Sequence, residues 1–359
     1  MPAQLFNAVV AIGLGTVVSV LLFVPVAAYQ YRRDGELSPR DLTVLVSAAV
    51  YSVALWTYTL LPLPDRGSFR CRVPQTELFG TIEDIGGPAD GLQVLLRDPV
   101  LQQVLLNVLL FVPFGVLVRL VLQRGVLAST VAGFSVSLLI ELTQRTGVWG
   151  FFGCAYRKFD VDDLLVNTLG ALVGALLALP LREQRDQPRP LPTRITWGRR
   201  MVGMVCDGLF VLLVGGLVAG LWRGLMLFVL DTSPHRDVQW VLQWTVPFAI
   251  EAVLVLGRGR TFGELVVAVT TRTDRRGWTA PARLLKLAAG VGPVYLLVMV
   301  PPQVPGREWL LAAYLVLTVV ATTVPDHRGL SHTVAGLRLE VEGRSLRRAS
   351  SRSPAGRAS

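Results

Sequence analysis

Long apolar stretches, separated by short polar segments, recur along almost the whole chain. Each holds roughly 17 to 25 residues, enough for a helix rising about 1.5 Å per residue to cross a hydrocarbon layer of about 30 Å. The pattern predicts an all-α, polytopic integral membrane protein with about nine transmembrane helices, five in the first half and four in the second. We place them at residues 5–29, 42–61, 100–118, 126–143, 164–180, 201–222, 239–256, 284–302 and 309–325.

The distribution of basic residues predicts the orientation of these helices. With the N-terminus outside and the C-terminus cytoplasmic, 25 of the 35 Lys and Arg residues fall on the cytoplasmic side, as the positive-inside rule requires. This placement explains most of the net charge of +10, so no nucleic-acid partner is expected. No Lys or Arg precedes the first apolar stretch, which favours a retained helix over a cleaved signal peptide. The predicted location is the cytoplasmic membrane.

Composition divides the chain into parts. The polar, proline-rich segment 181–193 predicts a cytoplasmic linker between a first transmembrane domain, 1–180, and a second one, 194–342. Residues 343–359 are rich in Arg and Ser. We expect them to form a disordered basic tail that contacts anionic lipid headgroups.

Two cytoplasmic segments have the composition of strands. Residues 264–273 are rich in β-branched side chains, and residues 336–341 alternate between apolar and charged positions. We predict short strands in both segments, paired in a β-hairpin-like element.

Polar side chains gather at the predicted outer ends of three helices in the first half. Glu141 and Gln144 share one face of the fourth helix, and Asp163 and Asn167 form an i, i+4 pair entering the fifth. Ionisable residues at this depth are costly to keep and indicate function. Together with one asparagine of the third helix and residues of the preceding loop they form the outer cluster: Asn107, Glu141, Gln144, Arg157, Asp160, Asp162, Asp163 and Asn167.

Two interpretations of the outer cluster are open. In one it binds a ligand: Arg157 neutralises carboxylates or pairs with an anionic group, the carboxylates bind amines or a cation, and the asparagines orient the ligand. In the other the asparagines join helices by hydrogen bonds, while Asp162 and Asp163 cap the fifth helix. Capping does not account for Glu141 on the neighbouring helix, which favours the first interpretation.

The first half resembles the VanZ-like family, which is named after a protein associated with resistance to the glycopeptide teicoplanin. Three blocks carry the resemblance, in the family's order and spacing: N-V-L-L-F-V-P-F-G from Asn107, I-E-L-T-Q from Ile140, and R-K-F-D-V-D-D-L-L-V-N-T-L-G-A-L-V-G from Arg157. The resemblance covers about residues 5–180. It implies a role in the cell envelope.

The three cysteines include two on the predicted outer side. A disulfide between Cys71 and Cys154 is conceivable in an oxidising compartment, and two separate thiols are the alternative. Cys206 is interpreted as a small buried apolar residue. No Cys/His pattern has zinc-ligand spacing, so we predict no metal site, and no cofactor is expected.

The second half contains a second group of charged residues, which we call the inner cluster: Arg199, Arg200, Asp207 and Glu251. They are predicted at a similar depth of the inner leaflet, as an intramembrane ion pair or as a proton- or cation-binding site. Arg200 and Asp207 in R-R-M-V-G-M-V-C-D resemble the RDD family, as do segments 259–269 and 332–341. The family's second aspartate would be expected near position 332, where this chain has His332 instead. The resemblance covers about residues 194–342 and implies ion transport.

No familiar catalytic motif occurs in the chain, so hydrolase and nucleotide chemistry has no support. Three functions remain. The first is an envelope protein that contributes to teicoplanin-type glycopeptide resistance by binding or modifying an outer-leaflet or cell-wall-linked ligand at the outer cluster. The second is RDD-type cation or proton transport through Asp207 and Glu251, and the third is a non-catalytic membrane scaffold. The expected partners are membrane lipids and a cell-wall precursor or lipoglycopeptide.

Overall fold

The structure is a computed structural model that describes residues 3–61, 63–65, 69–83, 97–180, 194–273, 275, 277–301 and 303–342. The predicted linker and tail lie outside the described residues. The chain forms two compact units: unit 1 comprises Met1–Ser19 and Thr43–Pro188, and unit 2 comprises Val20–Leu42 and Arg189–Ser359. The segment Val20–Leu42, which the sequence groups with the first half, therefore packs with the second.

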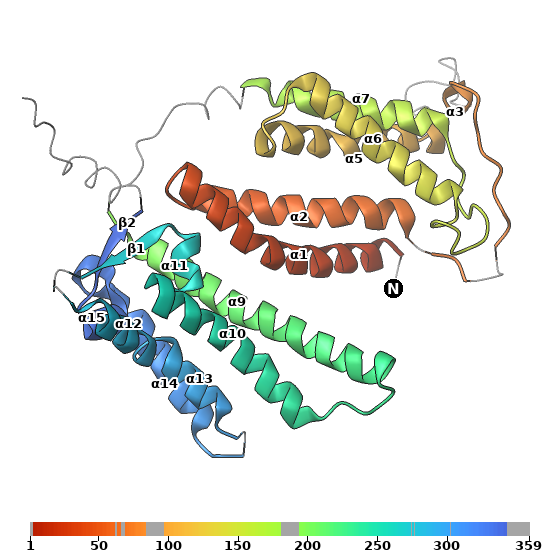
Figure 1. The fold of residues 1–359 in the computed structure, drawn as a ribbon. Helices are drawn as coiled ribbons and strands as arrows, with labels where there is room; N and C mark the ends of the chain where they lie inside the picture. Colours follow the sequence, from red (N-terminus) through yellow and green to blue (C-terminus); the bar gives the residue numbers. More distant parts are fainter. Residues whose placement is uncertain are drawn as a thin grey trace, which may run out of the picture. The chain divides into compact units, whose positions relative to one another are not determined.

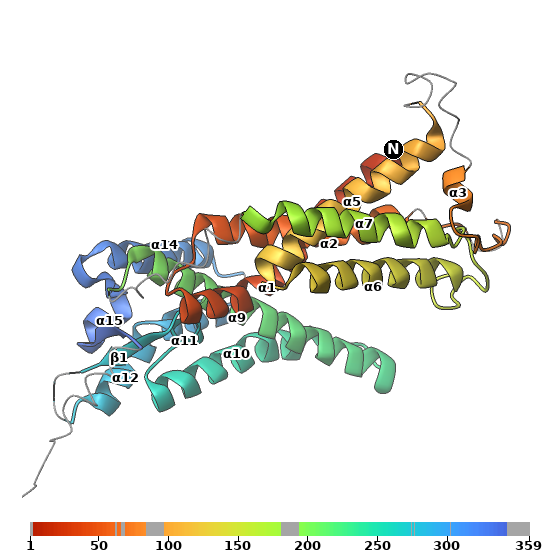
Figure 2. The ribbon, with the colours of Figure 1, turned by 90° about the horizontal axis from the view of Figure 1, so that it is seen from above.

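Unit 1 is built from the first part of α1 (Ala3–Arg33), most of α2 (Pro39–Leu60), the short α3 (Gly80–Glu83), α5 (Pro99–Val121), α6 (Val126–Arg145) and α7 (Val161–Leu177). Helices α5, α6 and α7 lie side by side in Figures 1 and 2. Small residues permit the close approach of α5 and α7, because a Cβ atom at Gly170 or Gly174 would overlap the backbone of Val108 or Val112. This packing brings the polar positions of the three helices together.

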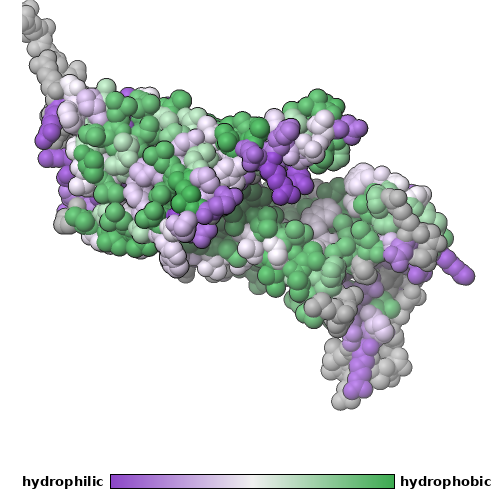
Figure 3. Space-filling view, turned by 90° about the horizontal axis from the view of Figure 1, so that it is seen from below, coloured by the Kyte–Doolittle hydropathy of each residue, from purple (hydrophilic) through white to green (hydrophobic). Residues whose placement is uncertain are grey.

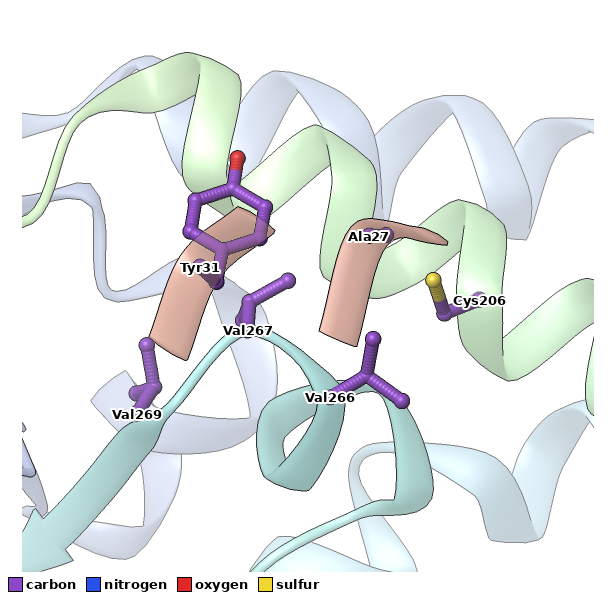
Figure 4. Packing of buried hydrophobic residues seen from close by; sticks show 6 residues of the cluster. All are labelled: Ala27, Tyr31, Cys206, Val266, Val267 and Val269. Carbon is purple, nitrogen blue, oxygen red and sulfur yellow. The ribbon is translucent and has the colours of Figure 1, made fainter. Parts of the chain in front are cut away.

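In its described residues, unit 2 contains the rest of α1, the start of α2 and seven further α-helices, together with short 3-10 and π turns. They are α9 (Trp197–Gly224), α10 (Arg236–Arg258), α11 (Phe262–Val266), α12 (Thr279–Ala288), α13 (Val291–Met299), α14 (Arg307–Val320) and α15 (Gly329–Ala335). Its largest core cluster joins three parts of the chain: Ala27 and Tyr31 of α1, Cys206 of α9, and Val266, Val267 and Val269 (Figure 4). The interpretation of Cys206 as a buried apolar residue agrees with this position.

The helices have the character expected of a membrane protein. Within the described residues, seven are long and apolar enough to cross a membrane, with α12 and α13 counted as one. Helices α7 and α14, of 17 and 14 residues, occupy the positions of the fifth and ninth predicted spans. Hydrophobic residues also cover much of the surface drawn in Figure 3. The molecule is thus an all-α polytopic membrane protein, while the count of nine spans and the orientation stay predictions.

The eighth predicted span is discontinuous. Helix α12 ends at Ala288, and α13 begins at Val291 after Gly290 adopts φ −125° and ψ −101°. The Tyr314 hydroxyl donates to the carbonyl oxygens of Ala289 and Gly290, at 3.0 and 3.2 Å. A side chain of the neighbouring helix α14 therefore satisfies the backbone groups that the break leaves free, as a break inside a membrane requires.

The small sheet confirms the predicted pairing and corrects its extent. Strand β1 (Val269–Arg272) pairs antiparallel with β2 (Arg338–Val341), so that Val269 lies opposite Val341. The expectation that the first strand begins at Glu264 was wrong, because this residue lies in α11. Thr261 and Glu264 form a capping box that starts this helix. Four helices separate the two strands in sequence, so the element is not a hairpin.

Candidate functional site

The outer cluster centres on the loop that leads into α7. Asp160 caps this helix: its side chain accepts a hydrogen bond from the backbone N–H of Asp162 at 3.0 Å. The backbone N–H of Asp160 in turn donates to Glu141 Oε2 at 3.0 Å. Only 2% of the surface of Glu141 is accessible to solvent. A carboxylate from α6 is therefore buried directly against the N-terminus of α7.

Two amide side chains connect the three helices at this depth. Asn107 on α5 donates to Asp163 Oδ1 on α7 at 2.7 Å. Asn167, one turn further along α7, donates to Ser137 Oγ on α6 at 2.9 Å. Ser137 lies four residues before Glu141, on the same helix face. Ser137 was not predicted as a member of the outer cluster, although its i, i+4 spacing from Glu141 is visible in the sequence.

Gln144 and Arg157 contact the backbone at the end of α2 and not the carboxylates of the cluster. Gln144 Nε2 and Arg157 Nη1 both donate to the carbonyl oxygen of Thr59, at 2.8 and 2.9 Å, and Arg157 Nη2 donates to that of Leu61 at 2.8 Å. These groups satisfy carbonyls at the C-terminal end of α2, which otherwise lack partners. Arg157 is within electrostatic range of Glu141 but forms no ion pair in the described part of the chain. The expectation that it directly neutralises a carboxylate therefore does not match its position.

Residues 71–79, which we call the outer loop after their predicted side, cover the start of α7. Residues 72–75 run along the segment that precedes the helix, with Arg72 N–H donating to Ala155 O and Gln75 N–H donating to Phe159 O, at 2.9 and 2.8 Å. Further along, Phe79 N–H donates to Asp162 Oδ1 at 2.6 Å. Cys71 and Cys154 form a disulfide, with their Cα atoms 5.7 Å apart. The loop is thus attached to the outer cluster by a covalent bond, by backbone hydrogen bonds and by Asp162.

The cluster holds more negative than positive charge. Lys158 Nζ lies 3.3 Å from Asp160 Oδ2, whereas neither Glu141 nor Asp163 has an ion-pair partner among the described residues. Glu141 interacts electrostatically with both Asp160 and Asp163. No group of three His, Cys, Asp or Glu residues in the described ranges is arranged to hold a metal ion. The buried Glu141 carboxylate and the half-buried Asp163 carboxylate are therefore close enough to interact, while neither is paired with a basic side chain in the described ranges.

The two carboxylates of the inner cluster lie at the start of α11. Asp207 accepts hydrogen bonds from the backbone N–H of Gly263 and from the Thr261 hydroxyl, the latter at 3.0 Å. Glu251 accepts from the backbone N–H of Phe262, at 3.2 to 3.3 Å. Both side chains thus contact the start of the same short helix, and neither forms an ion pair within the described ranges.

The two arginines of the inner cluster diverge. Arg199 donates to the carbonyl oxygen of Gly35 at 2.6 Å, and its guanidinium lies 5.0 Å from the ring centre of Tyr31. Arg200 Nη1 lies 3.2 Å from Glu264 Oε1, and Glu264 was not predicted as a member of the inner cluster. The expected pairing of these arginines with Asp207 and Glu251 is therefore replaced by other contacts.

Glu264 is the centre of a buried ionic network with Arg200, Lys286 and His332. Lys286 contacts its Oε2 atom, and His332 Nε2 lies 2.9 Å from Oε1. Burial alone would raise the pKa of Glu264, but Lys286, His332 and Arg200 together lower it well below its ordinary value. Burial and the nearby ammonium of Lys286 lower the pKa of His332 to about 4. We call these four residues the Glu264 network. At neutral pH the Glu264 carboxylate is therefore ionised and His332 is neutral.

Comparison with known families identifies the first of these regions. Residues 48–182 match the family model described as VanZ/LLP1. The chain contains a VanZ-like domain. This domain runs from the middle of α2 to the end of α7, so it includes the entire outer cluster and both disulfide cysteines. The RDD resemblance of the second half gains no support from the family comparison. No curated protein and no solved structure matches the chain.

Proposed function

We propose that the VanZ-like domain acts at the outer face of the cytoplasmic membrane, where its outer cluster binds an amine-bearing envelope ligand. A cell-wall precursor or a lipoglycopeptide has this chemistry. The observation that carries the proposal is the pair Glu141 and Asp163: two carboxylates at one depth, from adjacent helices, without an ion-pair partner in the described chain. Binding of this kind would contribute to resistance to teicoplanin-type glycopeptides, as the family resemblance implies.

The surrounding residues have supporting roles in this proposal. Asn107 holds the Asp163 carboxylate through the 2.7 Å hydrogen bond and leaves its second oxygen for a ligand ammonium group. Arg157 and Gln144 position the end of α2 beside the site. An ammonium group would form charge-assisted hydrogen bonds with both carboxylates, which are stronger than hydrogen bonds between neutral groups. The function is binding, and none of these residues is assigned a catalytic role.

The test is the sensitivity of cells to teicoplanin and other envelope-targeting lipoglycopeptides. Cells that carry Glu141→Gln or Asp163→Asn should become as sensitive as cells without the protein, because each change removes one negative charge at nearly constant shape. Glu77→Gln, an exposed carboxylate of the same outer loop, is the matched control and should retain resistance. Immunoblots of the membrane fraction must show equal amounts of each variant. Unchanged sensitivity of both site variants would reject the proposal.

A second candidate function is RDD-type cation or proton transport through the inner cluster. Two observations favour it: Asp207 and Glu251 have no ion-pair partner among the described residues, and the span formed by α12 and α13 is interrupted at Ala289 and Gly290. Broken helices of this kind form ion sites in many secondary transporters. Flux measurements in proteoliposomes test it, with Asp207→Asn as the site variant and the exposed Glu308→Gln as control. A signal no greater than that of empty liposomes would exclude transport.

A further inference from the structure

Unit 2 has a pocket of about 460 Å³ that belongs to neither cluster. Three segments line it: Arg194 and Ile195 ahead of α9, the turn 326–328 that follows α14, and strand β2. Helix α9 begins three residues after Arg194, and α14 ends six residues before Asp326. The pocket therefore lies close to the start of α9, a candidate membrane span, and close to the end of α14, which occupies the ninth predicted span.

Each of the three segments contributes one arginine to the pocket: Arg194, Arg328 and Arg338. Arg194 has no hydrogen-bond or ion-pair partner in the described part of the chain, and Arg328 is paired with Asp326 at 2.9 Å. Glu340 adds a second carboxylate. Arginine is suited to phosphate because its planar guanidinium donates two parallel hydrogen bonds to one anion. Three guanidiniums from separate segments can surround a phosphate from several sides.

The turn that lines the pocket has an unusual backbone. Asp326 and His327 have φ values of 70° and 50°, in the left-handed region that residues other than glycine rarely adopt. Contacts from other elements hold the turn, since His327 Nδ1 lies 2.9 Å from the carbonyl oxygen of Thr322, and Arg200 Nη2 donates to that of Arg328 at 3.5 Å. Such residues persist where the surrounding structure maintains them, often at ligand sites.

The geometry points to a binding site for a phosphate-bearing anion in this pocket. Anionic phospholipid headgroups and free phosphate share this chemistry. The three arginines hold the phosphate, while Asp326 positions Arg328 through their ion pair. The positive-inside rule places this end of unit 2 on the cytoplasmic side, where anionic lipids attract basic residues. The site does not depend on the function of either cluster.

The full-length protein in nanodiscs tests this inference. In phosphatidylcholine nanodiscs, inorganic phosphate at constant ionic strength should raise the midpoint of thermal unfolding, and the rise should grow with the logarithm of the phosphate concentration above the dissociation constant. In nanodiscs of equal parts phosphatidylcholine and phosphatidylglycerol, native mass spectrometry should detect retained phosphatidylglycerol. Stabilisation by phosphate alone identifies a soluble ligand, and retention of phosphatidylglycerol alone identifies the membrane lipid. Either result supports a phosphate site, and the absence of both overturns it.

Charge-removing variants locate the site. Arg194→Gln and Arg338→Gln should each weaken the apparent affinity about tenfold or more, the loss expected for one charge-assisted hydrogen bond. Arg258→Gln removes the same charge from an exposed position at the end of α10, outside the pocket, and should retain binding. Arg194 has no described intramolecular partner, so its variant is expected to fold normally. Equal losses in Arg194→Gln and Arg258→Gln would show general surface attraction and overturn the inference.

Discussion

The outer cluster and the Glu264 network each contain a buried carboxylate, but only the carboxylate of the Glu264 network is surrounded by basic side chains. Glu264 is surrounded by Arg200, Lys286 and His332. Glu141, which is equally buried, accepts one backbone hydrogen bond and faces two other acids. A carboxylate with basic partners on several sides has its charge balanced inside the protein, which is typical of a structural role. A carboxylate without them can gain from an external cation, and this difference separates a core element from a candidate site.

The largest effect should follow from removal of the central carboxylate of the Glu264 network. Glu264→Ala leaves Lys286 and Arg200 buried without their partner, and such changes cost about 3 to 5 kcal/mol of unfolding free energy. Denaturant unfolding of the purified protein in detergent micelles measures the loss. Glu308→Gln, an exposed carboxylate of α14, should change stability by no more than about 0.5 kcal/mol. A loss as small as that of the control would remove the contrast between the two regions.

The disulfide of unit 1 should have the next largest effect. Replacing both Cys71 and Cys154 by serine releases a loop of 83 residues and should cost about 2 to 4 kcal/mol, mainly by increasing the freedom of the unfolded chain. Limited proteolysis should then cleave the outer loop faster, while unit 2 keeps its protection pattern. Reducing agent should reproduce this in the wild type and add nothing in the double variant. Equal cleavage of wild type and variant would contradict the prediction.

The pH dependence of stability distinguishes the two regions through His332. Its pKa is lowered to about 4 in the folded protein, so the unfolded chain binds a proton first as the pH falls below the ordinary value of about 6.5. Stability should therefore decrease between pH 7 and pH 5, by about 2 kcal/mol for this group. His332→Gln should flatten the profile, whereas the exposed His235→Gln should leave it unchanged. An unaltered profile in His332→Gln would show that other groups are responsible.

The smallest effect should come from the hydrogen bonds between helices in the outer cluster. The coupling of Asn167 and Ser137, measured by a double-mutant cycle with alanine at both positions, should be about 0.6 kcal/mol, the average for such pairs in membranes. Thermal unfolding of the four proteins gives the value. A coupling above about 2 kcal/mol would indicate that the outer cluster is fixed as firmly as the Glu264 network, and the comparison would fail.

The sequence predicted the helices and the grouping of Asn107, Glu141 and Asp163 because both depend on local periodicity. A repeat of 3.6 residues determines the face on which a side chain lies. The partners of Arg157 could not be found in this way. They are backbone carbonyls at the end of α2, nearly a hundred residues earlier in the chain, and a carbonyl acceptor has no residue-type signal.

The Glu264 network was missed for two reasons. Thr261 and Glu264 have the spacing of a capping box, which was visible in the sequence, but the β-branched residues that follow favoured a strand. Lys286 and His332 are separated by 46 positions in the sequence. Only the packing of α12 against α15 brings both side chains to the Glu264 carboxylate. A local sequence pattern cannot predict that these side chains contact one carboxylate, because tertiary packing determines the contact.

The continuous helix α1 has a consequence for modularity. Residues before Val20 belong to unit 1, whereas Ala27 and Tyr31 fill the core of unit 2 (Figure 4). A gene cut at the proline-rich segment 181–193 would therefore produce a C-terminal fragment that lacks part of its own interior. The two halves could not be exchanged or inherited as independent cassettes unless the end of the first helix accompanied the second half.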